Sequence, residues 1–213
     1  MPWKVEVLDH RVLKELDSLA LDVLQRFLRI SELIEKHGRA AMQEPHVKHL
    51  EGRLWEMRMK GRDGIARAVF VTAVGERVVV VHAFEKKIQR TATARAGSRP
   101  PTSERGEVMG IPLKKVAQKW LKDPEFKAGY DALEEEFALA SLLIEARTRA
   151  NLTQAELASK MGTSQSTIAR LESGKAAPSL STLRRLAKAT GTRLEISFEP
   201  KRPARKARGT TAA

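Results

Sequence analysis

The chain has 213 residues, 42% of them hydrophobic, so one large domain or two small domains with packed cores are possible. It contains no cysteine, which excludes a disulfide framework and a thiolate metal site. A formal net charge of +13 predicts an anionic partner, and the absence of a signal peptide or a long apolar run predicts a cytoplasmic protein without membrane contact.

The first part of the chain begins with a strand and continues with helices. Residues 3–8 alternate between apolar and polar, which is typical of a short strand. Residues 9–37 carry apolar side chains at spacings of three and four, which predicts two antiparallel helices broken near Asp17. Residues 39–50 lack a clear period and are interpreted as a loop with some helix.

Three strands separated by short turns are predicted next. Residues 53–60 alternate strictly, with apolar side chains on one face and mainly charged side chains on the other. Two more strands follow at 65–74 and 77–84, and the last is almost wholly apolar, which favours a central position. This order predicts an α+β domain, an antiparallel sheet with helices on one side.

The exposed face of that sheet would collect five basic side chains, Arg58, Arg67, His82, Lys86 and Lys87. Arg67 stands alone among apolar neighbours, and a cation in that position needs a partner or a function. Lys86 and Lys87 also fit a face that is cationic by chance. His82 is either a proton-transfer group or a satisfied core histidine.

The segments HLEGRLWEMRMKGRDGIARAVFV and RVVVVHAFEKKIQRT resemble the RelE/HigB superfamily of toxins, in its phage-related HigB-like branch. The resemblance implies a RelE-like fold and a metal-independent endoribonuclease that cuts mRNA on the ribosome. Arg58 and Arg67 would hold the scissile phosphate, Lys86 or Lys87 would supply a further cation, and His82 would transfer protons. Some relatives poison DNA gyrase instead. The tyrosine that several RelE-type members use is missing from this half.

A linker and two helices are predicted after the sheet. Residues 93–108 have no apolar periodicity and are rich in Ala, Arg, Pro, Ser and Gly, as flexible linkers are. Residues 113–121 carry one apolar stripe of a short helix, which either belongs to the core of the second half or docks on the first half. We favour docking. Asp123 followed by proline starts another helix that is predicted to continue to about residue 150.

The stretch 153–174 has the features of a helix-turn-helix. Thr153 and Glu156 form a capping box at the first helix, and Gly162 ends it. Ser164 caps the second helix, whose outward side chains are polar. Two short helices joined by a tight turn with a glycine form this motif.

The second helix of that pair has an outward face suited to reading DNA. Glutamine bonds adenine bidentately, arginine does the same to guanine, and serine or threonine bonds either. An ordinary solvated helix pair is the alternative. TQAELA, MGTSQSTIARLESGK and PSLSTLRRLAKATG resemble the phage-repressor (XRE) helix-turn-helix family, which implies base-reading positions on this helix and a phosphate contact at Gln154. The predicted DNA-binding set is Gln154, Ser164, Gln165, Ser166, Thr167 and Arg170.

The end of the chain predicts a dimer and a basic tail. Residues 192–198 alternate like a short terminal strand, which would pair across a two-fold axis or join the first sheet. From residue 109 onward the chain resembles a HigA-type antitoxin, so we interpret the whole as a toxin and an antitoxin in one polypeptide, with Met109 as the former second start.

The predicted organisation has five parts: a toxin domain, a linker, an antitoxin arm, an all-α DNA-binding domain with a short terminal strand, and a disordered basic tail, at 1–92, 93–108, 109–130, 131–199 and 200–213. The expected partners are operator DNA, the ribosome with its mRNA, a second copy of the chain, and the two halves for each other. No metal and no cofactor are expected. The alternatives are a DNA-binding regulator that carries an inactive toxin relic, and a gyrase poison.

Overall fold

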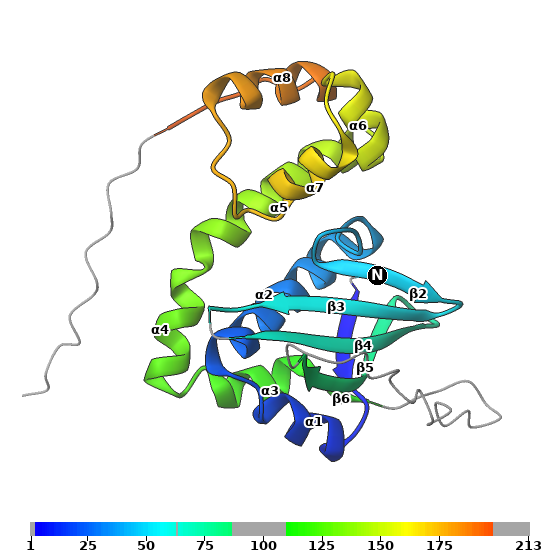
Figure 1. Cartoon of the computed structure of the whole chain (residues 1–213), viewed down its shortest axis with the longest axis vertical. Helices are drawn as coiled ribbons and strands as arrows, with labels where there is room; N and C mark the ends of the chain where they lie inside the picture. Colours follow the sequence, from blue (N-terminus) through cyan, green and yellow to red (C-terminus); the bar gives the residue numbers. More distant parts are fainter. Residues whose placement is uncertain (1–2, 63, 87–109, 198–213) are drawn as a thin grey trace, which may run out of the picture.

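The computed structural model describes residues 3–62, 64–86 and 110–197. Its centre is a six-stranded sheet in the order β2-β3-β4-β5-β1-β6 (Figure 1). β1 runs parallel to β5 and all other neighbours are antiparallel, so the sheet is mixed and the prediction of an antiparallel sheet is wrong for β1. Two helices follow β1 before the other strands begin, and such a crossover allows a parallel pairing. The strands are β1 Lys4–Val7, β2 Val47–Glu51, β3 Leu54–Lys60, β4 Ile65–Ala73, β5 Arg77–Glu85 and β6 Ile111–Pro112.

Two helices cover one face of this sheet, as the sequence predicts. α1 (His10–Asp17) begins where the Asp9 carboxylate accepts the backbone N–H groups of Arg11 and Val12, both at 2.9 Å. α2 (Leu21–His37) ends at Gly38, whose φ is +58°, and a single 3₁₀ turn, η1 (Gly38–Ala40), follows. The helices and the sheet enclose side chains that are at most 2% exposed, among them Leu16, Phe27, Ile34, Met57, Phe70 and Val80.

The interpretation of residues 39–50 as a loop is wrong at its end. β2 pairs with β3, with Val47 opposite Met57 and His49 opposite Trp55. Only Val47 of this strand is buried. Such an edge strand forms because a partner satisfies its backbone, and one buried position leaves no alternating pattern to detect.

The segment after the predicted linker docks on the first half. β6 pairs antiparallel with β1, and α3 (Leu113–Trp120) follows it directly. Leu113, Val116 and Trp120 of α3 belong to the same hydrophobic cluster as the residues of α1, α2 and the sheet. The Trp120 Nε1–H donates to Asp17 Oδ1 at 2.8 Å. The docking interpretation of residues 113–121 is confirmed.

The single helix predicted after Asp123 is two helices, α4 (Pro124–Ala132) and α5 (Glu134–Arg149), separated at Leu133. The sequence pattern crosses this break because apolar residues continue on both sides. Three consecutive glutamates occupy the first turn of α5, where negative charge favours a helix N-terminus. The start of a new helix at Glu134 therefore competes with the continuation of α4, and α5 runs in a different direction from α4.

The helix-turn-helix forms as predicted, from α6 (Gln154–Lys160) and α7 (Gln165–Glu172), and α8 (Leu180–Thr190) follows it. The capping box is complete: the Thr153 N–H donates to the Glu156 carboxylate at 2.7 Å, and the Glu156 N–H donates to Thr153 Oγ1 at 3.2 Å. Gly174 after α7 has a φ of +74°, and a β-carbon there would clash with the Glu136 carbonyl. The turn after α7 thus packs directly on α5.

The predicted terminal strand is absent from the described part, because residues 192–197 have no regular secondary structure. A strand needs a neighbour to accept its ladder of hydrogen bonds, and the described residues offer it none. Phe198, the linker 93–108, Met109 and the tail 200–213 lie outside the described residues. No helix in the described ranges is long and apolar enough to cross a membrane.

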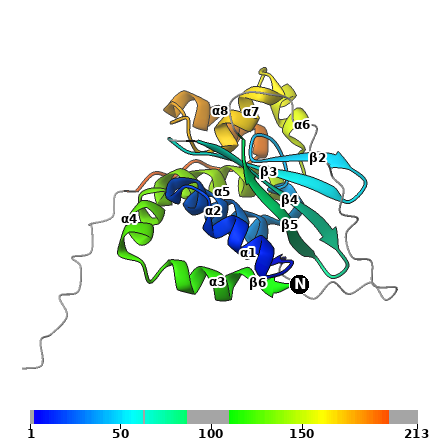
Figure 2. The same ribbon diagram turned by 60° about the horizontal axis from the view of Figure 1, so that its bottom comes forward.

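The two halves contact each other over a broad surface of helix α2. The Arg26 guanidinium donates to both Glu136 oxygens at 2.6 and 3.1 Å, and Gln25 Nε2 donates to the Phe126 carbonyl at 3.0 Å. The only tyrosine of the chain, Tyr130, lies under the Arg29 guanidinium, 3.6 Å from the ring centroid. Figure 2 shows the resulting arrangement, with α6–α8 standing over the β2–β3–β4 side of the sheet.

Candidate functional site

The two arginines that the sequence singles out lie side by side on the open face of the sheet. Arg58 of β3 is directly opposite Arg67 of β4. Like charges in such a pair repel each other, and a carboxylate between them removes the repulsion. Glu56 supplies it: Glu56 Oε1 accepts from Arg58 Nε at 3.0 Å and forms a short ion pair with Arg67.

A second carboxylate holds Arg58 from the loop before β2. The Arg58 Nη1 donates to both oxygens of Glu44, at 3.0 and 3.1 Å. The side chain of Arg67 is only 16% exposed and that of Arg58 is 29% exposed, so both guanidinium groups are partly desolvated. Fixed, partly desolvated guanidinium groups of this kind stabilise the charge of a phosphate once that phosphate has displaced the carboxylates.

The arginines line a cleft whose opposite wall is α7. The cleft has a volume of about 850 Å³. The sheet contributes Arg58, Lys60 and Arg67, whereas the second half contributes Gln165, Ser166, Ala169, Arg170 and Lys175. Residues predicted to cut RNA and residues predicted to read DNA therefore face each other across one space.

His46 closes the inner wall of this cleft. Its ring is 7% exposed and stacks on Phe137 of α5, with centroids 5.6 Å apart. Within the described chain its Nε2 has no hydrogen-bond partner. Burial, and next the positive charge of Lys175, lower the pKa of His46 to about 4, while the Glu136 charge and the Ser173 backbone act in the opposite direction. His46 is therefore neutral at physiological pH.

We expect the stability of the protein to fall as acid protonates His46 in the unfolded chain. The unfolded pKa is 6.5 and the folded pKa is about 4, so the unfolded state binds the proton first. The contribution of neutral His46 to the free energy of unfolding is fully present above about pH 6.5 and is lost progressively below it. The free energy of unfolding therefore falls by roughly 2 kcal/mol between pH 7.5 and pH 5. Urea unfolding at both pH values measures this. The variant His46→Gln has no titrating group at this position. Over the same pH interval its free energy of unfolding should therefore fall by about 2 kcal/mol less than that of the parent protein.

His82 and Lys86 are not among the residues that line the arginine cleft. The Nδ1 of His82 is 2.8 Å from Glu15 Oε2 of α1, and its ring stacks on Phe84. Its side chain is 48% exposed, so it is not a core histidine, although it has a partner. The backbone N–H of Lys86 donates to the Ile65 carbonyl at the end of β5, and its side chain is exposed. Lys87 lies outside the described residues.

The predicted DNA-binding residues divide into three groups. Gln165, Ser166 and Arg170 are exposed on the cleft side of α7. Ser164 and Thr167 bond each other at the N-terminus of α7, where the Ser164 oxygen accepts the Thr167 N–H at 3.2 Å. Gln154 is 1% exposed, so in this arrangement a DNA phosphate cannot reach it.

Gln154 belongs to a buried polar network that joins the two halves. Arg147 forms a bidentate ion pair with Glu172, at 2.6 and 3.1 Å, and both side chains are at most 4% exposed. The same Arg147 donates to the Ala40 carbonyl at 3.1 Å. The Gln154 Nε2 donates to Glu172 at 2.9 Å and to the Glu44 carbonyl at 3.1 Å. The segment from η1 to β2 is therefore tied to α5 through the Ala40 carbonyl and to α6 through the Glu44 carbonyl.

Four charged residues that line the cleft or pair with its arginines were not predicted as site residues: Glu44, Glu56, Lys60 and Lys175. A sequence signal exists only for Glu56 and Lys60, because strand alternation puts both on the face of Arg58. Glu44 and Lys175 lie in loops, and only the packing of the two halves brings them to the cleft.

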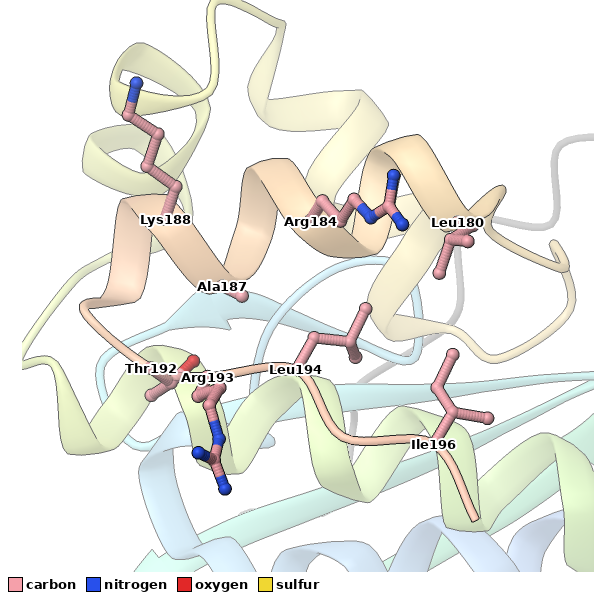
Figure 3. A pocket seen from close by; sticks show the side chains of 8 residues that line it. All are labelled: Leu180, Arg184, Ala187, Lys188, Thr192, Arg193, Leu194 and Ile196. Atoms are coloured by element: carbon pink, nitrogen blue, oxygen red, sulfur yellow. The ribbon is translucent and has the colours of Figure 1, made fainter. Parts of the chain in front are cut away.

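A second, shallower groove runs along α8. Leu180, Leu194 and Ile196 point into the space between α8 and the segment that follows it (Figure 3). Leu180 is 45% and Ile196 is 59% exposed, although both are large and apolar. No group of three potential metal ligands occurs among the described residues.

Comparisons with known proteins agree with a division into two parts. A family described as phage derived protein Gp49-like matches residues 14–96, and a helix-turn-helix family matches residues 143–196. Antitoxin HigA1 of Mycobacterium tuberculosis, from strains CDC 1551/Oshkosh and ATCC 25618/H37Rv, is 37% identical over 84 residues. That match covers 39% of this chain and 56% of HigA1, so the chain spans about half the length of the curated relatives it matches. The chain thus combines a Gp49-like region with a helix-turn-helix DNA-binding region similar to an antitoxin.

Proposed function

We propose that this chain is a toxin–antitoxin fusion whose second half binds operator DNA and represses its own promoter. The observation that carries this proposal is the exposed polar face of α7, with Gln165, Ser166 and Arg170 on a capped helix-turn-helix. The similarity to an antitoxin supports it. The second copy that a palindromic operator requires would pack on the apolar groove of α8.

The DNA-binding proposal is tested by the double variant Gln165→Ala with Arg170→Ala. Each bidentate base contact contributes about 1–3 kcal/mol of discrimination, so specific affinity should fall by at least ~30-fold, with non-specific affinity nearly kept. Fluorescence anisotropy compares a duplex from immediately upstream of the coding region with a scrambled duplex.

A matched control is Arg149→Ala, which removes a cation that is 75% exposed on α5. We expect it to leave the specific affinity unchanged. If the double variant also retains its preference for the upstream duplex, α7 does not read the bases.

For the first half we propose a RelE-like, ribosome-dependent mRNA endoribonuclease that needs no metal. Arg58 and Arg67 would bind the scissile phosphate, and their arrangement on neighbouring strands supports this role. The carboxylates of Glu44 and Glu56 now occupy both guanidinium groups, so the phosphate has to displace them. The same ion pairs favour the second candidate, a DNA-binding regulator whose first half is an inactive relic.

Expression of residues 1–108 in a bacterial host separates these candidates. Growth arrest with cleaved mRNA supports the nuclease, and arrest with damaged DNA and intact mRNA supports gyrase poisoning. Harmless expression of a segment that is folded by circular dichroism supports the relic. The control is the same segment with Arg58→Ala and Arg67→Ala, which should abolish mRNA cleavage.

A further inference from the structure

We propose that the cleft-facing side of α7 is one interaction surface with two mutually exclusive partners, the arginine cleft of its own chain and duplex DNA. Operator binding would then require α7 to leave the sheet, and the bound state would expose Arg58 and Arg67. This inference rests on the proposed DNA-binding function and adds the coupling between the two halves.

The residues that line the cleft from α7 are those a DNA groove would need. Gln165, Ser166, Ala169 and Arg170 occupy one face of the helix, and Arg58 and Arg67 stand on the opposite wall. A volume of about 850 Å³ is in the range of small-molecule pockets. A recognition helix must instead insert into a major groove about 12 Å wide, with DNA on both of its sides. The sheet occupies that space.

The predicted phosphate contact is blocked by the same loop. The Gln154 amide is 1% exposed because its Nε2 donates to the Glu44 carbonyl and to Glu172. The Glu44 carbonyl lies just before β2 in the first half, and the Ala40 carbonyl of the same region accepts from Arg147 of α5. Both kinds of DNA contact are therefore lost together when the halves close, and both would return together when they open.

The packing of α6–α8 allows these helices to move together with α5 as a unit. Leu157, Ile168 and Leu186 form a hydrophobic cluster of their own, separate from the cluster of the sheet. The clusters meet at α5, which contributes Ile144 to one and Leu143 to the other. Opening would hinge at Leu133 between α4 and α5 and would detach α5 from α2. Closure therefore lowers the apparent affinity for DNA in proportion to the fraction of open molecules.

Positive charges on both walls of the cleft favour its opening when a polyanion binds. Arg58, Lys60 and Arg67 on one wall face Arg170 and Lys175 on the other. Burial lowers the pKa of Lys175, and Arg26 and Lys60 contribute in the same direction. Glu44 and Glu136 offset this like-charge contact, and Glu56 pairs with both arginines. A polyanion that draws α7 away relieves the repulsion, as DNA would.

A cleavable staple across the cleft tests the proposal. The chain has no cysteine, so Lys60→Cys and Ala176→Cys introduce a single pair, one on each wall. A bifunctional thiol reagent with a reducible spacer locks the closed state. We expect the stapled protein to lose roughly 1,000-fold or more in affinity for the upstream duplex, the lower end of the range that separates specific from non-specific binding, and to regain it after reduction.

The controls separate this inference from the proposed function. Each single-cysteine variant should bind the upstream duplex equally well with and without the reagent. If the stapled protein binds the upstream duplex as tightly as the reduced protein, the exclusivity is refuted while DNA binding stands. If the stapled and reduced proteins and the chain without cysteine all fail to prefer that duplex, the DNA-binding function fails and the inference fails with it.

A variant that is expected to raise the affinity for the upstream duplex provides a second test. Arg26→Ala removes the bidentate bond from α2 to Glu136 of α5, which helps to hold the halves closed. It changes no residue of α7. We expect affinity for the upstream duplex to rise, roughly 5-fold, because more molecules are open. An unchanged or lower affinity would contradict a closed state that competes with DNA.

Discussion

Replacing Arg147 with alanine is expected to lower the free energy of unfolding by roughly 3–5 kcal/mol, because it leaves a buried carboxylate without its counter-charge. Arg147 is 2% exposed, and its guanidinium bonds both oxygens of Glu172. It also donates to the Leu152 carbonyl at 3.0 Å and to the Ala40 carbonyl of the other half. Urea unfolding of the variant and the parent measures the loss.

Two further variants identify the cause. Arg149→Ala removes an arginine of the same helix that is 75% exposed and pairs with Glu145, and it should cost at most about 0.5 kcal/mol. Arg147→Met combined with Glu172→Leu removes both charges and should be more stable than Arg147→Ala. If the double variant is instead the less stable of the two, the uncompensated charge of Glu172 is not the main penalty.

Truncating Trp120 to alanine is expected to cost roughly 3–5 kcal/mol as well, through a cavity where α3 meets the first half. Trp120 is 7% exposed and packs edge-on against Phe27 of α2, with ring centroids 6.5 Å apart. Phe126 of α4 lies 6.0 Å from the same ring. The side chain thus joins α2, α3 and α4, and thermal unfolding should show a lower midpoint.

Trp120→Phe separates packing from hydrogen bonding. It keeps most of the aromatic volume but loses the donor to Asp17 Oδ1, so about 1–2 kcal/mol is expected. Leu142→Ala, at a position on α5 that is 62% exposed, should change stability by no more than about 0.5 kcal/mol. A loss at Trp120→Ala as small as that at Leu142→Ala would mean that α3 does not hold the halves together.

The local elements could be predicted from the sequence because each carries its own signal. Strict alternation predicted β3, short turns delimited β4 and the almost wholly apolar β5, and the apolar stripe predicted α3. The capping box of Thr153 and Glu156 gave the start of α6. By contrast β2 has one buried residue, and the break at Leu133 interrupts no apolar pattern. Residues 192–197 alternate between apolar and polar side chains, but the described part of the chain offers them no neighbouring strand. The pattern alone therefore wrongly predicted a strand there.

The candidate site also combines features that local sequence patterns predicted with features that only the tertiary structure shows. Strand alternation is local, so it determined that Arg58 and Glu56 share a face, and the helix period determined that Gln165 and Arg170 point outward from α7. Only the tertiary structure decided that these two faces lie across one cleft and that Gln154 is buried. That contact joins residues about a hundred positions apart, and it depends on burial and charge pairing between the halves, which no local period records.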